Sequence, residues 1–193
     1  MDNLYNPDYH HRRSIRLRDY DYSEEGAYFV TICTLQRQCL LGDVSGGEVH
    51  LSRFGLIVAE CWEAIPTHFS NVELDSFVVM PNHVHGIVII LDGTQGDRAR
   101  HASPLHLNAR AKPVLLGTIV GSFKSAASRH INNLRGTPGE PVWQRNYYEH
   151  IIRKERELNG IREYIACNPV RWAQDENNPS NSMIELFDGD EAL

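Results

Sequence analysis

The stretch of sequence that decides the fold is residues 77–91, which read FVVMPNHVHGIVIIL. Runs rich in Val, Ile and Phe predict β-strands, because β-branched and aromatic side chains pack well on a pleated surface; two such runs occupy 77–80 and 83–91. Between them stand Pro81 and Asn82, which are typical of turns and of breaks in a strand. The stretch is therefore expected to form either a tight hairpin or one strand with a bulge.

The sequence on both sides of this stretch shows the periodicities of strands and of helices. Apolar residues spaced three and four apart predict helices, and short β-branched and aromatic runs predict strands. The chain is thus expected to mix the two kinds of element. Further strands are expected at 27–34, 48–51 and 147–152, and helices at 52–66, 114–134 and 154–167.

The chain has 193 residues, of which 41% are hydrophobic and 23% are charged, and these values are typical of one globular domain with tails. We divide it into a basic N-terminal arm at 1–20, a folded domain at 21–172 and an acidic, loosely ordered tail at 173–193. Residues 92–112 have no periodicity and carry Gly, Asp, Ser and Pro, so they are expected to form a long loop within the domain.

The charge of the chain is distributed unevenly. The formal net charge is −6, yet residues 98–172 carry +8, while residues 1–97 and 173–193 carry −8 and −6. A basic face can bind phosphate groups whatever the total charge, so nucleic-acid binding is one interpretation of the basic segment. A solvated helical surface with salt bridges explains the same pattern equally well.

The composition also bears on the cellular setting. The longest unbroken apolar run is 87–91, far short of the roughly 18 residues that a membrane helix needs. The first residues, MDNLY, lack a basic segment followed by an apolar core, so no secretory signal is expected. The four cysteines form no C-x-x-C pair, which favours free thiols in a reducing, cytoplasmic setting and disfavours a zinc ribbon.

Two pairs of polar residues, far apart in the sequence, have spacings that place both members of each pair on one side of a predicted element. His83 and His85 lie two apart on a predicted strand, so both imidazoles leave one face and can reach one metal ion. Tyr164 and Asn168 lie four apart on the last predicted helix, so they share one side of it. Pro169 disfavours helical dihedral angles at Asn168, which places Asn168 near the end of the helix. Each pair alone also has a structural explanation, as core histidines or as a boundary tyrosine and a capping asparagine.

These motifs together resemble a family of DNA-processing enzymes. MPNHVHG at 80–86 looks like the His-hydrophobic-His signature of the HUH single-tyrosine transposases, and YIACNP at 164–169 is similar to their Y-I-x-x-N-P block. Three further segments resemble the REP-associated tyrosine transposases, namely RRSIRL at 12–17, GAYFVT at 26–31 and WQRNYYEH at 143–150. The resemblance spans nearly the whole folded domain, and the motifs occur in the order of the family.

The resemblance implies a fold and a chemistry. The implied fold is α+β, a ferredoxin-like and RNA-recognition-motif-like antiparallel sheet with helices packed on one face. Carried over to this chain, Tyr164 is the nucleophile that forms a 5′-phosphotyrosine, and His83 and His85 are ligands of a divalent metal, Mg²⁺ or Mn²⁺. Asn168 takes the place of a glutamine ligand found in the insertion-sequence branch, since an amide oxygen from either residue can bind a hard cation.

The resemblance also implies that the partner is single-stranded DNA next to a hairpin. The protein is expected to bind it as a monomer or a homodimer, and no membrane is expected to take part. Basic side chains are the candidates for phosphate contacts, although each one alone is as readily a plain surface charge. These candidates are Arg12, Arg13, Arg16, Lys124, Arg129, Arg145, Arg153 and Lys154.

Alternatives exist for the nucleophile and for the function. Tyr147 and Tyr148 are rival nucleophiles, but Ile151 and Ile152 stand four positions after them and offer no amide ligand, so Tyr164 is preferred. A non-catalytic hairpin-binding protein derived from a transposase would bind DNA without cleaving it. A metal-dependent hydrolase would release nicked DNA with no attached protein.

Overall fold

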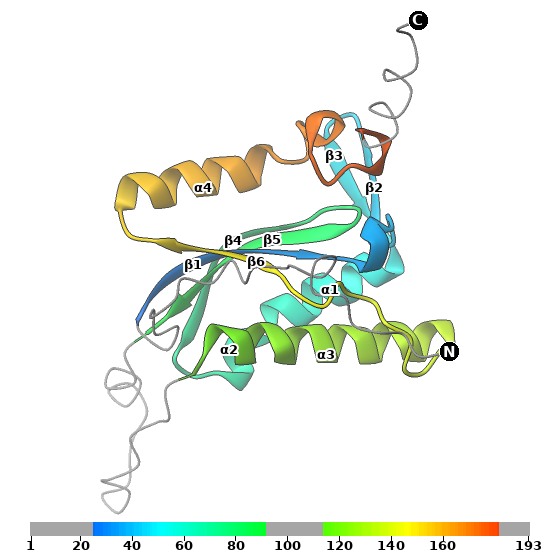
Figure 1. The fold of residues 1–193 in the computed structure, drawn as a ribbon, viewed down its shortest axis with the longest axis horizontal. Coiled ribbons are helices and arrows are strands. Elements are labelled where there is room, and N and C mark those ends of the chain that lie inside the picture. Colours follow the sequence, from blue (N-terminus) through cyan, green and yellow to red (C-terminus); the bar gives the residue numbers. More distant parts are fainter. Residues whose placement is uncertain (1–24, 92–113, 182–193) are drawn as a thin grey trace, which may run out of the picture.

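The computed structural model describes residues 25–91 and 114–181 of the chain. Within these two ranges the chain folds into a four-stranded sheet with helices on both faces and a two-stranded hairpin at one end (Figure 1). The predicted arm at 1–20, the predicted loop at 92–112 and residues 182–193 lie outside the described residues.

The main sheet is antiparallel throughout and has the strand order of a ferredoxin-like fold. Its strands are β1 (Gly26–Cys33), β4 (Val72–Val79), β5 (His83–Ile90) and β6 (Tyr148–Ile152), in the spatial order β4-β5-β1-β6. Counted along the chain, the first of these strands lies between the third and the fourth, and helices precede the second and the fourth. The α+β, ferredoxin-like class expected from the sequence is therefore confirmed.

The stretch around Pro81 and Asn82 forms a hairpin rather than one bulged strand. β4 and β5 pair in antiparallel fashion, and the amide of Met80 donates to the carbonyl oxygen of His83 across the turn at 2.8 Å. β4 begins at Val72, earlier than its apolar run indicates, because its first half mixes apolar with acidic residues. The choice that the sequence left open is thus decided in favour of the hairpin.

Local signals in the sequence set the ends of the helices. α1 (Arg53–Glu63) starts after Ser52, whose hydroxyl accepts hydrogen bonds from two amides of the first turn. α3 (Leu116–Arg135) ends at Gly136, which has the left-handed φ of 70° that a glycine adopts without strain. Among the described residues, no helix has the length and apolarity that crossing a membrane requires. The remaining short elements are η1 (Leu35–Arg37), β2 (Gly42–Ser45), β3 (Glu48–Leu51), α2 (Ile65–His68) and η2 (Trp172–Gln174).

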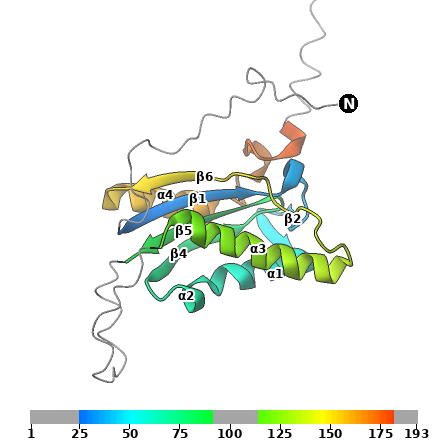
Figure 2. The ribbon, with the colours of Figure 1, turned by 60° about the horizontal axis from the view of Figure 1, so that its bottom comes forward.

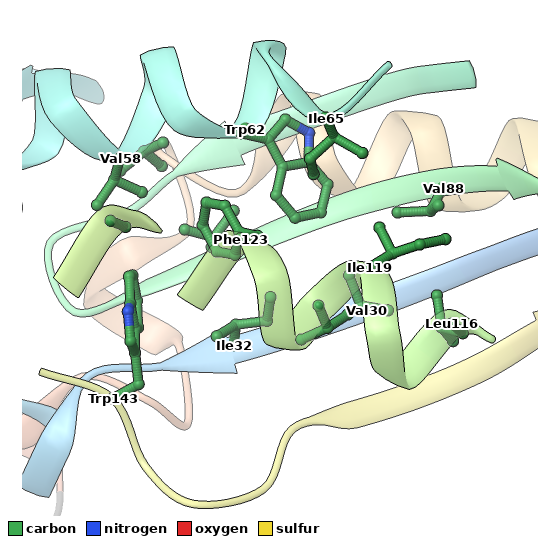
Figure 3. Close-up of a cluster of buried hydrophobic side chains, with 14 of the residues drawn as sticks. Val30, Ile32, Val58, Trp62, Ile65, Val88, Leu116, Ile119, Phe123 and Trp143 are labelled. Atoms are coloured by element: carbon green, nitrogen blue, oxygen red, sulfur yellow. The ribbon is translucent and has the colours of Figure 1, made fainter. Parts of the chain in front are cut away.

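The larger core lies between the sheet and the two helices α1 and α3, which run below it in Figure 1 and come forward in Figure 2. The ring of Trp62 from α1 meets the ring of Phe123 from α3 edge to face, with centroids 5.2 Å apart. Gly86 of β5 makes room for this tryptophan, because a Cβ at that position would overlap the indole ring. Figure 3 shows Trp62 and Phe123 among other buried side chains from both helices and from the strands, including Val30, Ile32, Val58, Val88 and Ile119.

The last helix, α4 (Glu155–Cys167), covers the opposite face of the sheet (Figure 1). Arg162 binds Asp75 of β4 through two hydrogen bonds, of 2.9 Å from Nε and 2.5 Å from Nη2. The expectation that the helices pack on one face therefore needs a correction: it holds for α1 and α3, but not for α4. The apolar stripe of a helix shows which side of the helix is buried, and it does not show which face of the sheet the helix covers. Under α4 lies a second, smaller core of Phe29, Ile87, Ile152 and Ile165.

The segment that follows α4 packs against the end of the sheet, and it was expected to begin the loosely ordered tail. Asp175, Asn177 and Asn178 are only 9%, 5% and 8% exposed. The side-chain amide of Asn82 donates to the carbonyl oxygen of Asn177 at 2.7 Å, which joins this segment to the turn between β4 and β5. The predicted tail at 173–193 is therefore wrong for residues 173–181, because backbone carbonyl oxygens of the segment accept hydrogen bonds from side chains of the folded domain, namely Arg37 and Asn82.

Candidate metal and tyrosine site

The two histidines singled out in the sequence lie on the sheet face that α4 covers. In β5, His83 pairs with Cys33 of β1, and His85 pairs with Thr31. Val84, between them, belongs to the larger core on the opposite face. The two imidazole rings lie side by side, with centroids 4.4 Å apart. The alternation of side chains along a strand thus brings both rings to one place, as the spacing predicts.

A neighbouring side chain fixes the orientation of each ring. Nδ1 of His83 lies 2.8 Å from the amide oxygen of Asn82, and Nδ1 of His85 lies 2.9 Å from the hydroxyl of Thr31. An amide oxygen only accepts hydrogen bonds, so Nδ1 of His83 carries the proton and its Nε2 keeps a free lone pair. Hydrogen bonds of this kind orient the histidine ligands of metal sites.

Burial keeps both imidazoles neutral. The side chains of His83 and His85 are 0% and 2% exposed. Burial lowers the pKa of His83 to about 3, and the nearby Arg37 acts in the same direction. Burial also lowers the pKa of His85 to about 3, assisted by His83 and opposed by Asp175. A neutral imidazole is the form that binds a metal, so the rings are ready to act as ligands at neutral pH.

Tyr164 reaches the same place from α4. Its hydroxyl oxygen lies 3.3 Å from Nε2 of His85, and its ring meets Phe29 edge to face. The side chain stays 38% exposed, so a large substrate has access to it. Burial and the nearby Asp175 raise the pKa of the phenol, while a hydrogen bond with the Asn168 side chain lowers it. A cation beside the phenol would oppose this rise by favouring the phenolate.

Asn168 occupies the C-cap of α4 and keeps helical dihedral angles, φ −59° and ψ −41°, although Pro169 follows it. The spacing of four residues from Tyr164 therefore retains its helical geometry, and the two side chains contact each other. Asn168 is only 2% exposed, and its amide oxygen is buried without a hydrogen-bond partner among the described residues. The structure thus gathers the four residues that the sequence analysis named as the catalytic site.

Asp175 is a fifth member that the sequence analysis missed. One of its carboxylate oxygens lies 4.0 Å from Nε2 of His83, and ligand atoms of His83, His85 and Asp175 all lie within 4.8 Å of one another. The segment from Asp175, which reads DENNP, was assigned to the acidic tail. Its Asp, Asn and Pro residues favour tight turns, and this signal could have indicated a return of the chain directly after the last helix.

These atoms suit a divalent cation. Nε2 of His83 and the amide oxygen of Asn168 are buried and unpaired within the described part of the chain, a costly state unless another group binds them. Two imidazole nitrogens and a carboxylate oxygen lie close enough together to form a donor set that accepts Mn²⁺ or Mg²⁺, and Asn168, in contact with Tyr164 beside them, offers an amide oxygen. The residues present therefore fit the metal that the resemblance implies.

The predicted DNA-binding cations have different environments. Lys124 is half-buried, and its ammonium donates to the carbonyl oxygens of Gln144 and Arg145 at 2.5 Å and 3.3 Å, so it holds the loop before β6 in place. This engagement opposes the expected role of Lys124 as a free phosphate contact. Arg12, Arg13 and Arg16 lie outside the described residues. The exposed candidates are Arg129, Arg145, Arg153 and Lys154.

The rival tyrosines lie on different sides of the sheet. Tyr147 packs against the larger core. Tyr148 is 43% exposed on the edge strand β6, where it pairs with Thr31 and its ring lies 6.3 Å from the ring of Phe29. Tyr148 thus shares the sheet face of the histidines, whereas Tyr164 contacts one of them directly.

Comparisons with known proteins find one close sequence relative and one solved structure that shares the fold. No model of a known protein family matches it. A Haemophilus influenzae protein of uncharacterised function is 42% identical over 181 residues, which cover 91% of this chain and 98% of that protein. The solved structure of a REP-associated tyrosine transposase bound to a REP hairpin has a TM-score of 0.54 at 18% identity, covering 82% of this chain and 74% of that one. A suspected transposase of Deinococcus radiodurans, 19% identical, covers 79% of this chain and 96% of its own, but its TM-score of 0.43 is too low to establish a shared fold.

Proposed function

We propose that this chain, which belongs to one family with the Haemophilus influenzae protein and has the fold of a REP-associated tyrosine transposase, is a DNA-strand transferase. It cleaves and rejoins single-stranded DNA near a hairpin through a covalent bond between Tyr164 and a 5′ phosphate. His83 and His85 hold the divalent metal, together with Asn168 and Asp175.

The observation that carries the proposal is the 3.3 Å between the hydroxyl oxygen of Tyr164 and Nε2 of His85. The two residues are 79 positions apart in the sequence and belong to different elements on one sheet face. A nucleophile beside a set of unpaired metal-ligand atoms is the arrangement that phosphoryl transfer needs. Packing alone would account for a buried tyrosine, whereas this one is partly exposed and keeps its hydroxyl at the candidate metal site.

The roles of the residues follow from their positions. The oxygen of Tyr164 forms a bond with phosphorus while the bond from phosphorus to the 3′ oxygen breaks; the tyrosine loses its proton, and the 3′ oxygen takes one up from solvent. The bond energy is conserved in the phosphotyrosine, so rejoining needs no ATP. His83, His85, Asn168 and Asp175 hold the cation, whose charge would offset the negative charge that builds on the phosphate in the transition state.

The donor set also bears on the choice of metal. Magnesium prefers oxygen ligands, and manganese accepts nitrogen and oxygen alike. The carboxylate of Asp175 adds a charged oxygen to the two imidazoles, which makes both ions acceptable. No thiolate belongs to the set, and this disfavours a structural zinc site.

The proposed substrate is a single strand that carries a hairpin, because the solved structure with this fold holds a REP hairpin. Phosphates of the hairpin would contact exposed basic side chains such as Arg129 and Arg145, and the adjoining single strand would lie across the exposed edge of Tyr164. We propose that the protein acts on this substrate as a monomer or a homodimer.

A covalent-adduct assay tests the proposal. The protein is mixed with a single strand that carries a hairpin and a label at its 3′ end, with Mn²⁺ or Mg²⁺, and the products are separated under denaturing conditions. We expect a labelled protein band with the wild type and with Tyr148→Phe, and no such band with Tyr164→Phe. Binding without any adduct would establish the non-catalytic hairpin-binding protein instead, and nicked DNA free of protein would establish the hydrolase.

A further inference from the structure

The side chain of Asn82 joins three parts of the chain at the candidate metal site. Asn82 is 0% exposed in the turn between β4 and β5. Its amide nitrogen donates to the carbonyl oxygen of Arg37 at 2.9 Å and to that of Asn177 at 2.7 Å, and its amide oxygen faces Nδ1 of His83 at 2.8 Å. Two of its three hydrogen bonds thus reach segments that lie 45 and 95 residues away in the sequence, and the third holds the neighbouring His83.

We propose that Asn82 is a positioning residue that sets two metal ligands at once, the imidazole of His83 and the carboxylate of Asp175. This inference rests on the proposed function, since it concerns how the chain holds the metal of that site. Asn82 itself does not face the substrate: it acts through the two ligands.

The first action of Asn82 is on the tautomer of His83. Both amide hydrogens of Asn82 are given to backbone carbonyls, so the group facing Nδ1 is the amide oxygen. Nδ1 must then carry the proton, and the lone pair lies on Nε2, the buried atom without a partner in the described residues. A metal ligand with its other nitrogen held in this way needs no reorientation when the cation arrives.

The second action is on the position of Asp175. Asn82 holds the carbonyl oxygen of Asn177, and the amide of Asn177 donates to one carboxylate oxygen of Asp175 at 2.6 Å. The other carboxylate oxygen is the one that lies 4.0 Å from Nε2 of His83. The turn at Asn82 therefore connects the strand that supplies the histidines with the segment that supplies the carboxylate.

The chemistry of the side chain explains why asparagine suits this position. An aspartate has the same shape and can still accept from Nδ1 of His83, but it has no hydrogen to give to Arg37 or Asn177. An alanine loses all three hydrogen bonds. Asn82→Asp therefore separates the two actions. His83 keeps its tautomer, and the hydrogen bond to the segment that carries Asp175 is lost.

The experiment measures binding of Mn²⁺ alone by titration calorimetry, together with the tautomer of His83 by ¹⁵N NMR of the metal-free protein. The control is Asn132→Asp, which changes another buried asparagine that donates to a backbone carbonyl, on α3 and away from the site. We expect Asn82→Asp to weaken Mn²⁺ binding by about 10- to 100-fold, the range seen when groups that orient metal ligands are changed, with no comparable loss in the control. In the wild type, the proton of His83 should be found on Nδ1.

A double-mutant cycle tests the connection to Asp175. If Asn82 acts through that carboxylate, Asn82→Asp should weaken Mn²⁺ binding much less in an Asp175→Asn background than in the wild type. Equal Mn²⁺ binding by Asn82→Asp and the wild type, additive effects in the cycle, or a proton on Nε2 of His83 would each overturn the inference. The tautomer of His83 is measured on the wild type only, so this part of the inference is tested even if Asn82→Asp does not fold.

The failure of this inference and that of the proposed function look different. A wild type that binds Mn²⁺ in an Asn82-dependent way and yields no adduct would refute the transferase and keep the positioning role. If the wild type forms the adduct and Asn82→Asp binds Mn²⁺ as tightly as the wild type, the transferase proposal stands and the positioning role of Asn82 is refuted.

Discussion

The attachment of α4 to the sheet gives a prediction that separates the two cores. Ile165 is 2% exposed and packs in the smaller core, and Ile165→Ala removes about three carbon atoms from it. At about 0.8 kcal/mol for each buried CH₂ group, the change weakens the docking of α4 by about 2.4 kcal/mol. The cavity that remains adds to this loss, because core truncations of this kind cost about 2–5 kcal/mol.

The assay is native-state hydrogen exchange of the α4 amides. If α4 detaches while the rest of the domain stays folded, a loss of 2.4 kcal/mol speeds exchange in α4 by about 50-fold. The matched variant is Ile119→Ala, which truncates the same residue type at 0% exposure in the larger core. It should lower the free energy of global unfolding by a similar amount and leave the local opening of α4 unchanged.

Equal acceleration of the α4 amides in both variants would refute the reasoning. It would mean that the two cores unfold as one unit, so that α4 has no opening of its own. Equilibrium denaturation of both variants provides the check that each has lost the expected global stability.

Three further predictions concern the site and the sheet beneath it. Tyr164→Phe should abolish the covalent DNA adduct while leaving hairpin affinity within about threefold, and Tyr148→Phe should keep both the adduct and the affinity. Gel-shift assays measure the affinity and denaturing gels measure the adduct. An adduct from Tyr164→Phe would exclude Tyr164 as the nucleophile. In the metal-free protein, the unfolded state protonates His83 and His85 below about pH 6.5 while the folded state does so only near pH 3, so the free energy of unfolding should fall as pH falls through this window, by about 1.4 kcal/mol per pH unit for each imidazole. Urea titrations of the wild type and of a variant with glutamine at both positions measure it, and an unchanged slope in the variant would contradict it. Gly86→Ala should cost about 1–3 kcal/mol in the same titration, because its methyl group overlaps the indole ring packed on that strand; an unchanged midpoint would show that the ring moves aside freely.

The local parts of the site could be predicted from the sequence because they depend on short-range geometry. The side chains of a strand alternate, so His83 and His85 had to share a face whichever sheet they joined. Helical periodicity likewise placed Tyr164 beside Asn168, and the structure keeps this spacing even with a proline directly after it.

The parts that could not be predicted depend on contacts between distant segments. The apolar stripe of α4 does not indicate that this helix covers the sheet face opposite to α1 and α3. Asp175 lies on a segment that the domain holds by hydrogen bonds from Arg37 to Glu176 and from Asn82 to Asn177, the second across 95 residues of sequence, and the acidic composition of the segment concealed this. Lys124 was grouped with phosphate-binding candidates from its charge, and the carbonyl groups that it binds come from a loop twenty residues away.

The division of the sheet into two unequally packed faces has a consequence for how such a protein can change over evolutionary time. The larger core, with Trp62 packed against Gly86, holds most of the buried apolar side chains of the described residues. The ligands and the nucleophile stand on the opposite face, above a handful of apolar side chains. Substitutions in the site or in the docking surface of α4 therefore remove only a small part of the buried apolar packing. The site can thus change in the course of evolution while the larger core keeps the domain folded.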